Sequence, residues 1–297
     1  MGRERLREAH GPVQRDLMRL SVRHSTTFSY DAPVYLEPHV IRLRPRADGG
    51  QRVGRFELAI DPAPVGRADC LDQDGNVVTQ VWFSGPVEQL RIESCFEVEL
   101  LRDNPFDFLL PAERWLVTPF AYGEPWNALL APYTSTNGIS AEVVAFAREM
   151  GVASGGRTLA FLNMLSRRLC EDWRQALRPE GEPYSSATTL AAREGSCRDL
   201  AVLFCDLCRA IGLASRFVSG YERSAAGLDR PHMHAWAEVY LPGGGWRGFD
   251  PSRGLAVARH HVAVAAARFP ALAAPLSGTY RGSAIAHLQA QISIELH

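Results

Sequence analysis

The 297-residue chain is predicted to fold as an α+β protein, with an all-β domain followed by helices packed on an antiparallel sheet. Three observations predict this arrangement. Short strand-like runs separated by turn residues fill residues 18–101, helical periodicity begins only near residue 140, and period-two alternation returns at residue 216. At about 150 residues per domain, a chain of this length is expected to hold two domains.

The composition is that of an ordinary globular protein and excludes several functional classes. The chain is 46% hydrophobic and 22% charged, with a formal net charge of −1. This balance predicts neither a nucleic-acid partner nor an anionic membrane surface as a partner. The sequence contains no lysine, which excludes Schiff-base enzymes and P-loop nucleotide binding.

The sequence also predicts a cytoplasmic location. Residues 1–17 have no apolar core of the kind a signal peptide needs, and no run of 18 apolar residues suggests a membrane span. The six cysteines are therefore expected to be reduced thiols rather than a disulfide framework.

We expect residues 1–17 to be a disordered extension without function and residues 18–103 to form the N-terminal β domain. In the last strand of that domain, Phe96, Val98 and Leu100 alternate with glutamates, as in a half-buried strand. The predicted strands, which together suggest a sandwich, cover residues 22–30, 39–43, 55–60, 76–83 and 89–101.

Residues 104–139 are predicted to be a proline-rich connector, and residues 140–297 the second domain. Predicted helices cover residues 140–150, 158–170 and 196–211, and predicted strands cover 216–222, 234–240 and 246–250. The third helix carries apolar residues at spacings of 4, 3 and 4, which are Leu200, Phe204, Leu207 and Ile211.

Cys197 lies at the predicted start of the third helix, within Gly195-Ser-Cys-Arg-Asp199. Unpaired backbone N–H groups and the positive end of the helix dipole favour a thiolate at that position. A buried structural cysteine is the alternative interpretation.

A predicted hairpin supplies the base that such a thiolate needs. If Tyr240 pairs with Trp246, then His234 and Asp250 become diagonal neighbours on one face, with Cβ atoms about 7–8 Å apart. The carboxylate could then hold one ring nitrogen of His234 and leave the other for a thiolate. A slip of one residue would move Asp250 to the opposite face.

Two other interpretations of these residues are open. His232 has the same strand parity as His234 and could replace it as the base. A metal site could combine Cys205 and Cys208 with His232 and His234, although their spacing matches no common zinc module. We expect no metal and no cofactor.

Several motifs together resemble the bacterial transglutaminase-like family, whose members are regarded as papain-like cysteine enzymes. The motifs are Gly195-Ser-Cys-Arg-Asp-Leu-Ala201, Arg209-Ala-Ile-Gly-Leu-Ala-Ser-Arg-Phe-Val-Ser-Gly-Tyr221, His234-Ala-Trp-Ala-Glu-Val-Tyr240 and Gly248-Phe-Asp-Pro-Ser252. Residues 18–30 resemble the start of that family's N-terminal β domain, and residues 103–110 resemble its domain junction. Arg198 departs from the family pattern, in which many relatives have Gln.

The resemblance implies a papain-like or transglutaminase-like core for residues 140–297, with Cys197 as nucleophile, His234 as general base and acid, and Asp250 as the residue that orients His234. It also makes Tyr184 a candidate, since the family often has an aromatic residue before the nucleophile. The implied reaction is acyl transfer from an amide through a thioester, with a peptide or protein as substrate. We favour hydrolysis by a protease or amidase; a transglutaminase or acyltransferase using an amine acceptor is the alternative, and an inactive binding scaffold is a third. The oligomeric state is left open.

Overall fold

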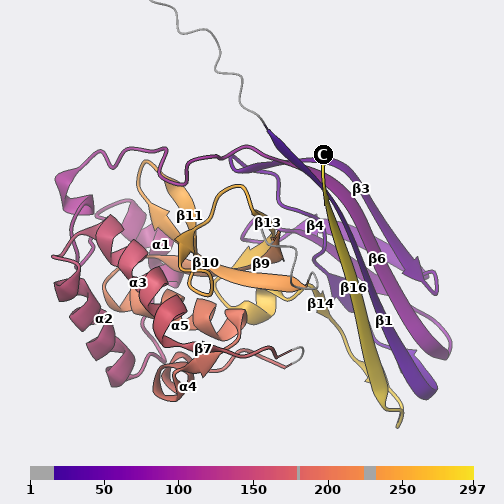
Figure 1. Cartoon of the computed structure of the whole chain (residues 1–297). Coiled ribbons are helices and arrows are strands. Elements are labelled where there is room, and N and C mark those ends of the chain that lie inside the picture. The colour runs from indigo at the N-terminus through magenta and orange to yellow at the C-terminus, as the bar shows by residue number, and fades with distance from the viewer. Residues whose placement is uncertain (1–16, 179–180, 224–231) are drawn as a thin grey trace, which may run out of the picture.

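The computed structural model describes residues 17–178, 181–223 and 232–297. The extension predicted over residues 1–17 lies outside the described residues, apart from Leu17. Figure 1 shows a group of helices on one side, long strands on the other, and a further sheet between them. The predicted α+β class is confirmed.

The strand-rich region consists of two sheets that pack face to face. The first has the order β15 (Tyr280–Arg281), β1 (Met18–Leu36), β6 (Val87–Leu100) and β3 (Gln51–Asp61), with β16 (Ala286–Leu296) also paired to β1. The second has the order β14 (Leu276–Ser277), β2 (His39–Ile41), β5 (Val77–Trp82) and β4 (Gly66–Leu71). Apolar residues of both sheets form one core, including Val34, Ile41, Val81, Leu90 and Ile92. This is the sandwich-like arrangement that the alternating pattern indicated.

The end of the chain returns to the strand-rich region. β16 runs antiparallel beside β1, with Leu20 opposite Leu296 and Tyr30 opposite Ala286 (Figure 1). The sequence-based division kept residues 140–297 together, whereas strand pairing joins residues 276–296 to the N-terminal sheets. Pairing between strands so far apart in the chain has no local sequence signal, which explains the difference.

The helices follow the first six strands and cover one side of the central sheet. They are α1 (Trp126–Thr134), α2 (Ala141–Ala153), α3 (Thr158–Asp172), α4 (Ser186–Ala192) and α5 (Cys197–Ala210), with 3-10 turns η1 (Glu113–Trp115) and η2 (Pro270–Ala273). The three predicted helices match α2, α3 and α5 closely. α1 lies inside the predicted connector despite Pro132, and α4 was not predicted because it is only seven residues long.

The central sheet is antiparallel and carries the candidate site. Its order is β12 (Leu255–Ala256), β11 (Gly245–Asp250), β10 (Met233–Leu241), β9 (Ser215–Glu222) and β13 (His261–Ala267), and a short parallel pair, β7 (Arg174–Gln175) and β8 (Glu194–Gly195), lies before α5. The apolar stripe of α5 packs on this sheet: Phe204 is fully buried and stacks on Phe249 of β11, with ring centroids 5.9 Å apart. The start of α5 is thereby held against the sheet.

The strand-rich region packs directly on β9 and β13. Leu20 and Val22 of β1, together with Phe96 and Val98 of β6, form a buried cluster with Tyr221, Val262 and Val264. The first sheet therefore contributes to two cores, one within the sandwich and one shared with the central sheet.

Two amide side chains of the strand-rich region close the open edge of β13. Gln51 accepts a hydrogen bond from the N–H of Ala263 at 2.8 Å and donates one to its carbonyl at 2.7 Å. Asn76 likewise accepts a hydrogen bond from the N–H of Ala266 at 2.9 Å and donates one to its carbonyl at 2.8 Å. Each amide substitutes for a neighbouring strand, so the edge has no unpaired backbone groups at these positions.

The substitution Asn76→Ala is expected to lower the free energy of unfolding by about 2–4 kcal/mol, because it leaves two buried backbone groups unpaired at about 1–3 kcal/mol each. Urea denaturation monitored by fluorescence measures the loss. Asn137→Ala removes an exposed amide and serves as control, with an expected change within about 0.5 kcal/mol. Equal stability of the two variants would contradict a stabilising role for the hydrogen bonds between Asn76 and Ala266.

His24 is a buried histidine between the first sheet and β9. Its Nδ1 lies 2.8 Å from the Tyr221 hydroxyl and its Nε2 lies 3.0 Å from Oγ1 of Thr26. Burial lowers the pKa of His24 from 6.5 to about 4. The neutral ring is thus the form that the packed regions tolerate.

Because the folded pKa of His24 is depressed, its contribution to stability is complete above the unfolded value of 6.5 and is lost as the pH falls towards 4. The loss corresponds to about 3 kcal/mol at 1.36 kcal/mol per pKa unit. His24→Gln is expected to flatten the stability curve between pH 6.5 and 4, measured by urea denaturation at each pH. The exposed His287→Gln control should retain the slope of the unsubstituted protein; identical slopes in both variants would refute the assignment.

Candidate active site

Cys197 is the first residue of α5, as the sequence predicted, and its side chain is partly exposed. The turn that leads into the helix is held by Asp199, a fully buried residue. Its Oδ2 accepts hydrogen bonds from the backbone N–H and the hydroxyl of Ser196, at 2.7 and 2.8 Å. Asp199 thereby fixes the residue immediately before Cys197.

The segment preceding this turn is tied to the same helix. Oδ1 of Asp199 accepts the N–H of Tyr184 at 2.7 Å, and Arg198 donates to the carbonyls of Gly181 and Arg178 at 2.8 and 2.6 Å. The Arg178 guanidinium lies over the Tyr184 ring, 3.7 Å from its centroid. The residue that departs from the family pattern therefore anchors the loop beside Cys197, and half-exposed Tyr184 packs against that loop.

The hairpin of β10 and β11 has the register predicted from the turn, with Tyr240 opposite Trp246. This register places His234 and Asp250 on the same face. Nε2 of His234 lies 2.7 Å from Oδ2 of Asp250, and both side chains are buried. The one-residue slip that would have separated them does not occur.

The Asp250 carboxylate is hydrogen-bonded on both oxygens. Oδ1 accepts from the N–H and hydroxyl of Ser252, at 2.9 and 2.7 Å, and from the N–H of Arg253 at 3.2 Å. Oδ2 accepts from His234 and also from Nε2 of His261, at 2.8 Å. Burial alone would raise the pKa of Asp250, but the His234 charge and the hydrogen bonds from both histidines hold it well below its usual range.

His234 connects this carboxylate to Cys197. Burial acts to lower the pKa of His234, but the charge and hydrogen bond of Asp250, with a smaller contribution from a hydrogen bond to Cys197, raise it to about 10. Because Nε2 is directed at Asp250, Nδ1 is the nitrogen left for the Cys197 sulfur. The three residues singled out from the sequence are thus brought together.

Trp236 forms a buried wall beside these groups. Its ring centroid lies 6.3 Å from that of His234, with the two rings inclined by 30°, and 5.1 Å from that of His261, edge to face. Since residues two apart on a strand share a face, the sequence of β10 places Trp236 next to His234. The indole shields the imidazole–carboxylate hydrogen bonds from water. These bonds are stronger in such a low-dielectric environment than in water.

The structure does not favour His232 as the base or the cysteine–histidine metal site. His232 is exposed, with its ring 6.4 Å from that of His234, and it is His234 that meets Asp250. Cys205 and Cys208 lie in the apolar core of α5, where burial raises the pKa of both thiols, that of Cys205 to about 11. The structure therefore does not bring the proposed cysteine–histidine metal ligands together.

A different group has atoms close enough to share a metal ion. Among the described residues, the ligand atoms of His234, Asp250 and His261 all lie within 4.8 Å of one another. The hydrogen bonds from both rings to Asp250 already account for this arrangement. His261 was missed in the sequence, where it only interrupted an apolar stretch; its position on β13, across β9 from the hairpin, has no local signal.

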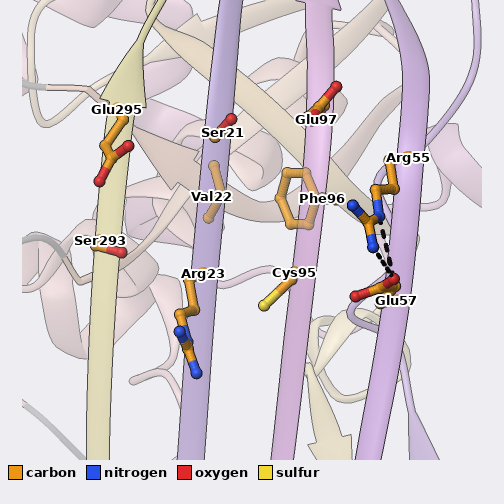
Figure 2. Close-up of a pocket in the computed structure, with 10 residues that line it drawn as sticks. All are labelled: Ser21, Val22, Arg23, Arg55, Glu57, Cys95, Phe96, Glu97, Ser293 and Glu295. Carbon is orange, nitrogen blue, oxygen red and sulfur yellow. Dashed lines mark hydrogen bonds and ion pairs between the residues drawn. The ribbon is translucent and has the colours of Figure 1, made fainter.

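The first sheet carries an open hollow on its surface (Figure 2). Its lining comes from β1, β3, β6 and β16, and includes Arg23, Arg55, Glu57 and Cys95. Arg55 is bonded to Glu57, and Arg23 to Glu93 at 2.8 Å. The arginines are thus neutralised within the sheet, and none of the candidate catalytic residues lies there.

No helix in residues 17–178, 181–223 and 232–297 has both the length and the apolar character to cross a membrane.

Comparison with known proteins gives matches along most of the chain. An uncharacterized protein of Mycobacterium tuberculosis is 28% identical over 282 residues, covering 88% of this chain and 87% of the relative. An uncharacterized protein of Mycobacterium leprae is 25% identical and covers 94% and 99%. Among solved structures, a protein of Cytophaga hutchinsonii provisionally described as a cysteine protease superposes with a TM-score of 0.70 at 17% identity, covering 95% and 91% of the two chains, which shows a shared fold.

Two family models match consecutive parts of the chain. Residues 20–99 match the bacterial transglutaminase-like N-terminal region, and residues 160–251, which contain Cys197, His234 and Asp250, match the transglutaminase-like superfamily. The chain thus matches a bacterial transglutaminase-like N-terminal region followed by a transglutaminase-like core.

Proposed function

We propose that the protein is a papain-like cysteine enzyme that breaks an amide bond in a peptide or protein. Cys197 is the nucleophile, His234 the general base and acid, and Asp250 the residue that orients His234. One observation carries the proposal: His234 is hydrogen-bonded to buried Asp250 through Nε2 while its other side serves Cys197. The superfamily match and the description of the Cytophaga relative as a provisional cysteine protease support it.

The electrostatics of the site favour a thiolate paired with an imidazolium. The raised pKa of His234 means that its ring holds a second proton readily, and that proton is supplied by the thiol. The N-terminus of α5 adds unpaired N–H groups and the positive end of its dipole at Cys197. Both effects stabilise negative charge on the sulfur.

Acylation begins when the thiolate attacks the amide carbonyl carbon. A C–S bond forms and negative charge develops on the carbonyl oxygen, for which the Cys197 N–H is a candidate donor. The C–N bond then breaks, and the imidazolium of His234 gives its proton to the leaving amine. The product of this half-reaction is an acyl-thioester with a neutral imidazole.

Deacylation by water completes the reaction. His234 takes a proton from the attacking water, the C–S bond breaks, and the carboxylic acid leaves as the thiolate is restored. Hydrolysis is favoured because Cys197 is partly exposed, so water has access to a thioester. If an amine attacks instead, the same intermediate yields a new amide, as in a transglutaminase.

We also propose that the enzyme works in a reducing compartment, in keeping with the predicted cytoplasmic location. All six cysteines, including the exposed Cys70, are free thiols. A free nucleophile is compatible with that setting.

Iodoacetamide is expected to alkylate Cys197 at pH 6 at least about tenfold faster than the other cysteines, because ordinary thiols with a pKa of about 8.5 are protonated there. Peptide mapping by mass spectrometry follows each cysteine. His234→Ala should abolish the preference, whereas the matched control His232→Ala, at an exposed position just before β10, should keep it. Equal alkylation rates at all cysteines would indicate an inactive scaffold and contradict the proposal.

A peptide library incubated with the enzyme is expected to yield pairs of products whose summed mass exceeds that of the parent peptide by one water. The same incubation with an excess of a primary amine separates the two outcomes: amine adducts mark a transferase, and unchanged hydrolysis marks a protease or amidase. Because the enzyme has no lysine, its own side chains cannot supply that acceptor. Cys197→Ala should eliminate either product, whereas Cys70→Ala, on exposed β4, should not; activity in the Cys197 variant would exclude it as nucleophile.

A further inference from the structure

His261 is a buried polar residue of the site with no part in the mechanism above. Its Nε2 lies 2.8 Å from Oδ2 of Asp250, the same oxygen that His234 meets at 2.7 Å. Only 4% of its surface is exposed. A carboxylate that needs only to orient one histidine does not require a second imidazole on that atom.

The two histidines on this oxygen have different surroundings. Nδ1 of His261 is buried and finds no hydrogen-bond partner in the part of the chain that the structure describes. Since a carboxylate accepts only from an N–H, Nε2 carries the proton of His261. Nε2 is therefore the nitrogen through which His261 acts on the carboxylate. His234, with Asp250 on one side and Cys197 on the other, can hold two protons.

We infer that His261 is a positioning residue, which locks the Asp250 carboxylate in the orientation that His234 needs and keeps the imidazolium able to release its proton. The inference rests on the proposed function. An oxygen offers two lone pairs in the carboxylate plane. With one occupied by His261 and Oδ1 occupied by Ser252 and Arg253, the remaining direction is that of His234.

The second donor on the shared oxygen also weakens the pull of the Asp250 carboxylate on the His234 proton. Each hydrogen bond donated to a carboxylate lowers its basicity. Without His261, Oδ2 would keep a single donor beside the indole of Trp236, and the more basic carboxylate would hold the His234 proton more tightly. Transfer of that proton to the leaving amine would then be slower.

The strand that carries His261 is positioned by the N-terminal region. β13 pairs with β9, where His261 lies opposite Glu222, and its other edge is held by Gln51 and Asn76. His261 thus links the strand-rich region to the carboxylate at the centre of the site. The N-terminal region acts on the site through the placement of one strand.

Titratable and charged groups reach this cluster from each neighbouring element. They are Cys197 on α5, Cys170 on α3, His234 on β10, Glu222 on β9, Arg253 in the turn after β11, and His260 beside His261. Arg253 and Glu222 form an ion pair at 2.6 Å. A comparison of variants that differ only at residue 261 holds all of these groups constant.

The test measures the rate of Cys197 alkylation by iodoacetamide from pH 5 to 11, in which the alkaline step reports loss of the His234 proton. His261→Phe fills the space without a donor and is expected to move that step upward by about one pH unit. His261→Gln puts an N–H near the Nε2 position and should restore the profile; His261→Asn, whose amide is too short, should not. With a cleavable peptide, His261→Phe and His261→Asn should lower kcat about tenfold at unchanged KM.

His39→Phe is the matched control, because it removes a buried histidine of the strand-rich region that is bonded to a backbone carbonyl. It should lower stability and leave the alkylation profile unchanged. If the Gln and Asn variants behave alike, or the Phe variant matches this control, the role of His261 is overturned while the proposed function stands. If Cys197 reactivity does not depend on His234 at all, the proposed function itself fails. Should the Phe variant not fold, the Gln and Asn pair decides alone.

Discussion

A buried negative charge at Asp250 is the constraint on which the site depends. A carboxylate without solvent is costly unless every lone pair has a donor. Ser252 and Arg253 supply donors from the turn after β11, His234 from β10 and His261 from β13. The charge is therefore stable only when β10, β13 and the turn after β11 meet at Asp250. The buried carboxylate in turn raises the pKa of His234.

The strand-rich region has a structural role in this meeting. β13 is an edge strand, and an open edge next to a buried charge would be prone to slip or to pair with other strands. The amides of Gln51 and Asn76 bond its backbone, and the cluster of Val22, Phe96 and Val262 packs beneath it. β16 pairs with β1 and so adds the C-terminal strand to the sheet that holds β13 in place.

Much of the site was accessible to sequence reasoning because its signals are local. The apolar spacing of α5 and the Ser-Cys start predicted Cys197 at a helix N-terminus, and the hairpin turn predicted the face shared by His234 and Asp250. The resemblance added the roles of these residues. Asp199 and Arg198, which hold the loop before the helix, were visible only as neighbours of Cys197, because their partners lie up to 20 residues away.

The sequence by itself determined the class of fold, the main helices and strands, and the three residues of the candidate site, since each follows from periodicity, turn length or a short motif. Tertiary structure alone decided that His261 shares the Asp250 oxygen, that residues 276–296 complete the N-terminal sheets, and that Cys205 and Cys208 are core residues. The reason is physical: these contacts join residues or surfaces whose meeting depends on how whole sheets pack, and no local pattern encodes that packing.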